Sequence, residues 1–214
     1  MTKFLSYFLS LLLFSSVANA QTDAKAQEIL KGVSSKYRSY KSLSASFKFS
    51  ILDQKTKKTE SQTGTITLKG SQFNLVMADQ TVMNDGKVNC TYMKESNEVQ
   101  ISEAKTSPDA ITPANIFTMY EKGFKSKFIG EKTIAGKAVQ QIELVPEDKK
   151  KNFFKIQLTI DKAGKFVSEA KIYNKDGNIM TYAIQKFSPN IAVTDDMFVF
   201  NKAKYPGVEV VDLR

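Results

Sequence analysis

The side chains that most often carry out chemistry are scarce in this sequence of 214 residues. Histidine is absent, and Cys90 is the only cysteine. Without histidine there is no Ser/His or Cys/His pair for nucleophilic catalysis, and the commonest zinc ligand is missing. A single cysteine forms neither an internal disulfide nor a thiolate metal cluster. We therefore expect no cofactor and no metal, and Cys90 is interpreted as a small buried apolar residue.

Carboxylate chemistry is the remaining enzymatic option. The two adjacent acid pairs, Asp195-Asp196 and Glu147-Asp148, both lie in loop-like sequence. A solvated pair is commoner in such a setting than a catalytic one, because a general acid or base needs a perturbed environment. We expect a binding protein and no enzyme. An exported enzyme that uses Asp, Glu or Lys is one alternative, and a plain β protein with a filled core is another.

The first twenty residues have the pattern of a secretory signal peptide. Lys3 precedes an apolar run that ends near Phe14, and the small residues Ala18-Asn19-Ala20 follow. The run is shorter than the ~20 apolar residues that a membrane-spanning helix needs. We predict cleavage after Ala20, which leaves residues 21–214 as one exported, periplasmic domain.

The formal net charge of +9 limits the class of partner. An exported protein does not meet nucleic acid, so no nucleic-acid partner is expected. Anionic membrane surfaces and acidic proteins are available to it. A solvated basic surface without a partner is the simpler alternative.

Two segments have helical patterns. In residues 22–40, apolar side chains recur every three or four positions, which is typical of an amphipathic helix. In residues 112–124, Pro113 suits the first helical position and Gly123 suits the end of a helix. This second helix is apolar around much of its circumference, so it needs apolar cover or must itself cover an apolar surface.

From Leu43 onward the apolar period changes from about four residues to two, which predicts half-buried strands. About ten such strands follow one another across Gly-, Asn- and Asp-rich turns, and Asp176-Gly177 is the strongest hairpin signal. The turn at residues 84–86 precedes a strand in which Val88, Cys90 and Tyr92 share one face. We expect that face to point toward the interior of the sheet.

A sheet of about ten one-sided strands must curl around its apolar face, because sheets twist and large ones curve or close. The predicted fold class is mainly β with two or three helices: a curved antiparallel sheet that forms an open half β-barrel covered by a helical lid. Incomplete filling would make the interior a hydrophobic cavity. The candidate cavity residues are Phe47, Phe49, Phe73, Leu75, Met77, Tyr92, Phe154, Ile156 and Leu158. The candidate lid residues are Ile29, Val33, Ile116, Phe117, Met119 and Tyr120. The simpler alternative is that these side chains are ordinary core.

Several motifs together resemble one family. They are YKSLSASFKFS after the first helix, GTITLKGSQFNLVM, the NDGK turn, and the ending FVFNKAKYPGVEVVD with its Phe-x-Phe and Pro-Gly-Val pattern. In this order they resemble the periplasmic outer-membrane lipoprotein carriers, the LolA family, over essentially the whole chain after the signal peptide.

The resemblance implies a specific function. Members of that family hold the acyl chains of a lipoprotein in a hydrophobic cavity under a helical lid. They receive the lipoprotein from an inner-membrane ATP-driven complex and deliver it to an outer-membrane acceptor, and they act as monomers without hydrolysing anything. A second possibility within the same architecture is a periplasmic module that senses lipid or lipoprotein and regulates a membrane partner.

One departure from the family pattern concerns the lid. Where better-studied members have Lys-Arg-Pro, with the Arg tied to lid closure, this sequence has Lys69-Gly70-Ser71. A latch through that Arg is therefore absent. Lys69 is the nearest candidate to replace it, although an ammonium lacks the planar fork of a guanidinium.

Overall fold

The computed structural model describes residues 18–104, 115 and 118–214, with side chains described from residue 24 onward. This part of the chain contains one α-helix, α1 (Ala18–Arg38), and twelve strands in a single sheet. The strands are β1 (Leu43–Asp53), β2 (Thr59–Lys69), β3 (Gln72–Met77), β4 (Gln80–Asn84), β5 (Val88–Met93), β6 (Glu98–Glu103), β7 (Phe124–Ile134), β8 (Lys137–Pro146), β9 (Phe153–Asp161), β10 (Phe166–Asn174), β11 (Asn178–Pro189) and β12 (Glu209–Asp212). The 3-10 turns η1 (Met119–Glu121), η2 (Asp195–Phe198) and η3 (Lys202–Lys204) complete it.

The predicted mainly-β class is confirmed, and the helix count is not. Of the second predicted helix, the structure describes only its end, where the amides of Thr118 and Met119 donate to the carbonyl oxygen of Asn115 and lead into η1. Gly123 has a positive φ of 77°, but Lys122 before it is extended, so Gly123 leads into β7 and does not cap η1 directly. The candidate lid residues Ile116 and Phe117 lie outside the described residues.

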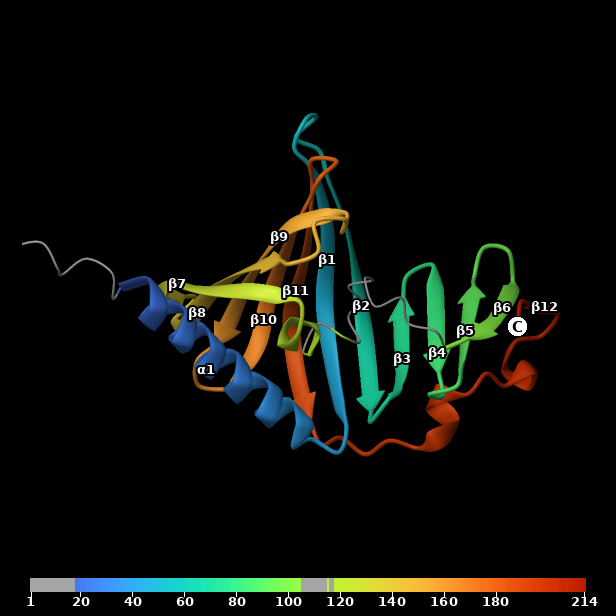
Figure 1. The fold of residues 1–214 in the computed structure, drawn as a ribbon. Coiled ribbons are helices and arrows are strands. Elements are labelled where there is room, and N and C mark those ends of the chain that lie inside the picture. Colours follow the sequence, from blue (N-terminus) through green and yellow to red (C-terminus); the bar gives the residue numbers. More distant parts are fainter. Residues whose placement is uncertain (1–17, 105–114, 116–117) are drawn as a thin grey trace, which may run out of the picture.

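The sheet is two meanders placed side by side. Its strand order is β12-β6-β5-β4-β3-β2-β1-β11-β10-β9-β8-β7, so the early strand β1 pairs with the late strand β11. All neighbours are antiparallel except β12, which runs parallel to β6. The sheet curves but leaves β7 and β12 as separate edges, so it is an open sheet and not a closed barrel (Figure 1).

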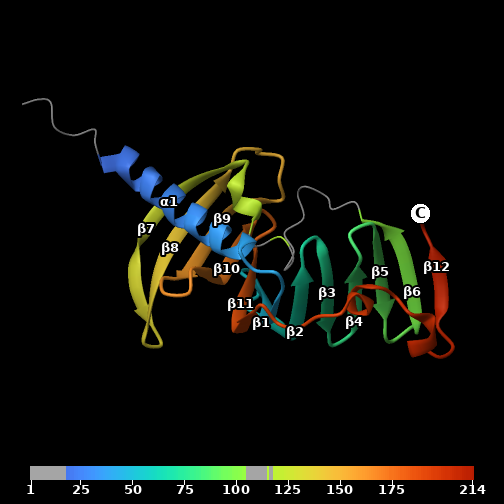
Figure 2. The same cartoon turned by 90° about the horizontal axis from the view of Figure 1, so that it is seen from below.

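Helix α1 crosses one face of the sheet, which we call the inner face, and packs on β7 and β10 (Figures 1 and 2). Its stripe Ala26, Leu30 and Val33 is buried, as the three- and four-residue spacing predicted. These residues join one continuous core with the inner-face side chains of β1, β2 and β8–β10. Full burial of a Leu or Val side chain stabilises the fold by about 1.5–3 kcal/mol, so this stripe holds the helix in place.

A second set of buried residues lies on the opposite, outer face of β4–β6. After β11 the chain crosses this face and reaches the far edge as β12 (Figure 2). Along this C-terminal segment Phe198 and Val208 are buried, as are Met83 and Val99 of the sheet. None of these four residues belongs to the core under α1. The fold therefore has apolar packing on both faces of one sheet.

The expectation for Val88, Cys90 and Tyr92 is wrong. The turn before them forms as predicted, with Gly86 at φ +92° and the Asp85 carboxylate accepting from the amides of Lys87 and Val88. The register then places Cys90 opposite Met83 and Ile101, on the outer face. The Tyr92 ring lies 4.5 Å from that of Tyr205, and its hydroxyl donates to Asn97. Alternation defined the two faces correctly, but the C-terminal segment covers the apolar one.

The sequence also predicted Phe154 on the inner face, and the structure places it on the outer face. The ladder between β9 and β10 shifts register between Phe153 and Lys155, so Phe154 is the extra residue of a β-bulge. The bulge turns Phe153 into the core and leaves Phe154 51% exposed on the outer face, beside Tyr173. An alternating pattern cannot show an inserted residue, because it reads the same with either Phe inside.

Gly64 lies directly opposite Phe47 in the ladder between β2 and β1. A Cβ at residue 64 would meet the Phe47 ring at 2.7 Å and the Val76 carbonyl oxygen at 3.1 Å. We predict that Gly64→Ala lowers the free energy of unfolding by about 1–3 kcal/mol, through overpacking. Gly32→Ala in α1 is the control: a Cβ there meets nothing within 4 Å, so the same change should stabilise the protein by about 0.5–1 kcal/mol. Urea unfolding measures both, and equal effects would contradict this account.

Phe198 and Val199 test the outer-face packing with two neighbouring residues. Phe198 is 1% exposed and Val199 is 48% exposed. Phe198→Ala should destabilise the protein by about 3–5 kcal/mol because it opens a cavity under the C-terminal segment. Val199→Ala should change the stability by about 0.5 kcal/mol or less. Thermal unfolding of the two variants measures these effects. A Phe198→Ala variant with an unchanged unfolding temperature would mean that the C-terminal segment is not part of the cooperative fold.

Candidate functional site

An apolar surface lies on the inner face beyond the reach of α1. The helix packs on β7 and β10, whereas β1–β3 and β11 present further apolar side chains on the same face. The ladders align Phe49 with Tyr182, Ile51 with Met180, and Ile66 with Leu75. We call the partly buried members of this group the inner apolar surface: Phe49, Phe73, Leu75, Met180 and Tyr182.

Aromatic packing builds the centre of this surface. The Tyr182 ring lies 4.8 Å from Phe49 and 6.2 Å from Phe47, centroid to centroid. Burial raises the pKa of Tyr182 to about 12, so its phenol is neutral at physiological pH. The alternating residues Lys48 and Ser50 of β1 point to the outer face. The inner apolar surface can therefore accept an apolar chain, and Tyr182 adds one neutral polar group.

The structure divides the nine candidate cavity residues into three groups. Phe49, Phe73 and Leu75 lie on the inner apolar surface, and Met77 lies at its end, 9% exposed. Phe47, Ile156 and Leu158 are on the inner face too, but they are fully buried and form the layer beneath or beside it. Tyr92 and Phe154 are on the outer face.

The candidate cavity residues chosen from the sequence did not include Met180 and Tyr182. Both lie in the strand after the correctly predicted turn at Asp176-Gly177. Their membership depends on β11 pairing with β1, from which it is separated by more than a hundred residues in the chain. The alternation of residues 178–184 was visible, but nothing local indicates the strand that lies beside it.

Side-chain contacts tie η1 to α1. The Ser34 hydroxyl donates to the Tyr120 hydroxyl at 3.3 Å, and the Arg38 guanidinium forms an ion pair with the Glu121 carboxylate. Burial is the main cause that raises the pKa of Tyr120 to about 12, so this phenol also stays neutral. A cleft of about 350 Å³ lies between α1, η1 and the start of β7. The segment that ends at η1 is therefore anchored on the helix.

The four described lid candidates all belong to this helix–η1 region. Val33 and Tyr120 are buried, while Ile29 and Met119 are partly buried against the core. They hold α1 and η1 on the sheet. Whether they move as a lid stays a prediction.

Lys69 does not face α1. Its ammonium lies 2.5 Å from the Asp195 carboxylate, on the outer face where η2 crosses the sheet. Asp196 pairs with Lys204 at 3.4 Å. These pairs fasten the C-terminal segment, so Lys69 does not replace the missing Arg on the inner face. They also occupy one of the two acid pairs considered for catalysis.

The described residues contain no group of three His, Cys, Asp or Glu side chains placed to hold a metal ion. Within the same described part of the chain, no helix is long and apolar enough to cross a membrane.

Solved structures share the fold at low sequence identity. An uncharacterized conserved protein from Thermus thermophilus matches with a TM-score of 0.61 and 13% identity, over 88% of this chain and 99% of its own. The Mycobacterium tuberculosis lipoprotein LppX matches with a TM-score of 0.51 and 9% identity, over 80% of this chain and 100% of its own. No curated protein matches significantly.

The family comparison covers most of the chain. The model of the outer membrane lipoprotein carrier protein LolA matches residues 38–201, from the end of α1 to the C-terminal segment. This range includes every strand that contributes to the inner apolar surface. The chain therefore belongs to the LolA family of outer membrane lipoprotein carrier proteins.

Proposed function

We propose that this protein is a periplasmic carrier that binds the acyl chains of lipoproteins on the inner apolar surface and takes them from the inner to the outer membrane. The observation that carries the proposal concerns the described residues: α1 packs on β7 and β10, and apolar side chains of β1, β3 and β11 stay partly exposed on the same face. Family membership makes lipoprotein the first choice of ligand.

The chemistry of the surface fits an acyl chain. Transfer of one CH₂ group from water to an apolar site gains about 0.8 kcal/mol, so a sixteen-carbon chain gains roughly 10 kcal/mol when it is fully covered. A carrier must also release its cargo. A surface that is half-buried against its own core has less apolar area to offer than an empty cavity of the same outline, which keeps the affinity below that limit.

The proposed cycle needs export and two partners. Residues 1–20 serve as the cleaved signal peptide, an inner-membrane ATP-driven complex loads the carrier, and an outer-membrane acceptor unloads it. The segment before η1, with Ile116 and Phe117, serves as the lid, and the Ser34–Tyr120 and Arg38–Glu121 contacts anchor its end on α1. No step requires catalysis by this chain.

Leu75 and Val76 provide a matched test, because they are neighbours in β3 that point to opposite faces. Leu75 belongs to the inner apolar surface, and Val76 is 43% exposed on the outer face. We predict that Leu75→Asp weakens capture of a diacylated lipopeptide at least about tenfold, because the Asp carboxylate would have to be buried against the acyl chain of the ligand. Val76→Asp should leave capture unchanged.

Circular dichroism must first show that both variants are folded. Equal capture by the folded Leu75→Asp and Val76→Asp variants would contradict the proposed site. The carrier role needs a second readout, transfer of the bound lipopeptide to acceptor vesicles. A sensing module of the same architecture would bind the lipopeptide without passing it on.

A further inference from the structure

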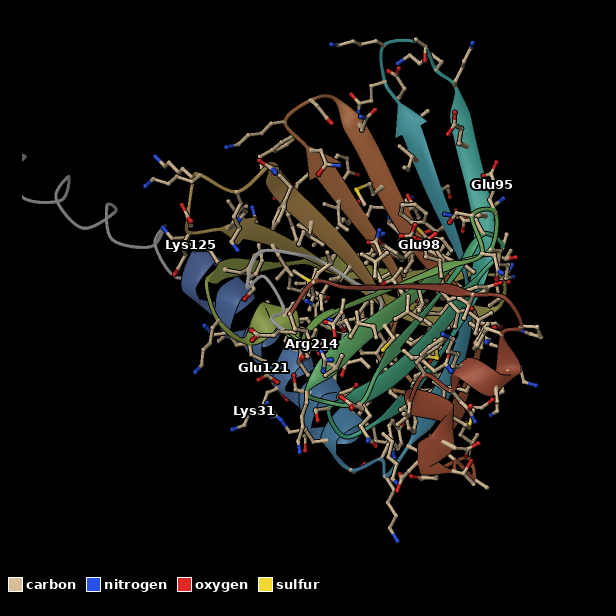
Figure 3. All side chains as sticks on the ribbon, turned by 90° about the vertical axis from the view of Figure 1, so that its right-hand side faces the viewer. Lys31, Glu95, Glu98, Glu121, Lys125 and Arg214 are labelled. Atoms are coloured by element: carbon tan, nitrogen blue, oxygen red, sulfur yellow. The ribbon has the colours of Figure 1, made fainter. Side chains whose placement is uncertain are left out.

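The charge of this protein is concentrated in one half of the sheet. Residues 24–69 and 121–189, which form α1, β1, β2 and β7–β11, contain 24 basic and 11 acidic residues, a net charge of +13. Residues 72–104 and 190–214, which form β3–β6 and the C-terminal segment, contain 5 basic and 9 acidic residues, a net charge of −4. Figure 3 views the molecule from the β12 edge of the sheet and labels Glu95 and Glu98 of the second set and Lys31 and Lys125 of the first. The molecule therefore has a strongly basic half and a weakly acidic half.

One corner of the basic half also exposes apolar side chains. The β-bulge of β9 leaves Phe154 51% exposed on the outer face, and Val145 at the end of β8 is 43% exposed. Lys125 of β7 is the ladder partner of Val145. The loop between β8 and β9 adds Lys149 and Lys150, both exposed. We call these five residues the β8–β9 corner.

Neighbouring elements hold this corner in shape. The Glu147 amide donates to the Gly123 carbonyl oxygen at 2.9 Å, and the Lys175 amide donates to the Asn152 carbonyl oxygen at 2.8 Å. The Lys175 ammonium also donates to the Lys149 carbonyl oxygen at 2.5 Å. The loop is thus tied to the start of β7 on one side and to the β10–β11 turn on the other. It presents its lysines beside Phe154 from a fixed backbone.

We propose that the β8–β9 corner docks this protein on the surface of an anionic phospholipid membrane. Lysines around an exposed aromatic ring suit such a surface, because the ammonium groups meet the anionic headgroups while the ring enters the boundary of the acyl chains. Docking uses the outer face, so it does not depend on the ligand bound to the inner apolar surface. The proposal goes beyond the proposed carrier function and can hold without it.

The kind of basic residue favours a membrane over an acidic protein. Arg38 is the only arginine among the basic residues of this half, and the corner contains lysine alone. Arginine predominates in protein–protein interfaces, where its planar fork pairs with carboxylates, whereas lysine is depleted there. Flexible lysine ammonium groups act as point charges, which suits a laterally mobile layer of headgroups. The acidic half is repelled by the same layer, which orients the molecule on it.

Vesicle sedimentation of the mature chain tests the proposal. The probe is a phosphatidylcholine vesicle in which about a third of the lipid is phosphatidylglycerol, at low ionic strength where surface electrostatics are strong. We expect co-sedimentation with these vesicles, little with pure phosphatidylcholine, and release by salt. Absence of binding to the anionic vesicles would overturn the proposal and would favour an acidic protein as the partner of the basic half.

Two triple variants locate the contact. The first variant should bind the vesicles at least about tenfold more weakly, because it removes three positive charges from the corner; it combines Lys125→Gln, Lys149→Gln and Lys150→Gln. The control combines Lys41→Gln, Lys137→Gln and Lys165→Gln, three exposed lysines at the opposite end of the strands in this half of the sheet. It removes the same charge and should retain binding. Equal loss in both variants would mean that total charge acts without a docking corner.

A fluorescence experiment tests insertion directly, because the sequence contains no tryptophan. The emission of a Phe154→Trp variant should shift to the blue when anionic vesicles are added, as the ring enters an apolar layer. The control is Val76→Trp, at an exposed outer-face position in the acidic half. An unshifted Phe154→Trp variant, or equal shifts in both, would contradict docking through this corner.

Discussion

The pairing of β1 with β11 is the constraint on which the rest of this structure depends. It joins two meanders, β1–β6 and β7–β11, each of which is held together by local turns. It also determines which residues of every strand lie on the inner face and which on the outer face, because the side chains of each strand alternate in register with those of its neighbours. Leu43 and Ala45 belong to the same core as the stripe of α1, and from them the ladders fix that Leu75 faces inward and Cys90 outward. A slip of one residue at this pair would exchange the faces of one meander relative to the other.

Packing on both faces follows from the length of the sheet. A single helix about thirty ångströms long cannot cover twelve strands that lie roughly 4.8 Å apart. Helix α1 packs on β7 and β10, and the C-terminal segment covers β4–β6 from the other side. Between these two covers lie β1–β3, whose inner-face side chains are buried at Leu43 and Ile66 and stay partly exposed at Phe49 and Leu75. Among the described residues, the inner apolar surface is thus the part of the inner face that α1 and the core leave partly exposed.

The sequence predicted what depends on local chemistry and missed what depends on distant pairing. The turns at Gly86 and Gly177, the stripe of α1 and the alternation of the strands were all predictable, because each rests on a few neighbouring residues. Tyr92 was placed on the wrong face because an alternating strand does not say which of its faces meets the helix. Phe154 was misplaced because two adjacent phenylalanines hide a bulge. Met180 and Tyr182 were not included among the candidate cavity residues because their neighbour in the sheet is far away in the chain.

The arrangement also bears on how strongly a ligand can be held. Phe47, Ile156 and Leu158, which look like cavity walls in the sequence, are already packed against their own neighbours. They gain nothing further from a ligand unless the sheet or helix moves. Only the outermost layer, such as Phe49 and Leu75, has apolar area left to bury. A larger area on this face needs a shift of α1 or η1. Besides the buried stripe of α1 and the buried Tyr120 ring, η1 is joined to α1 by an exposed ion pair and one hydroxyl–hydroxyl hydrogen bond. The two polar contacts are individually weak, whereas burial of the apolar stripe supplies most of the attachment of α1 to the sheet.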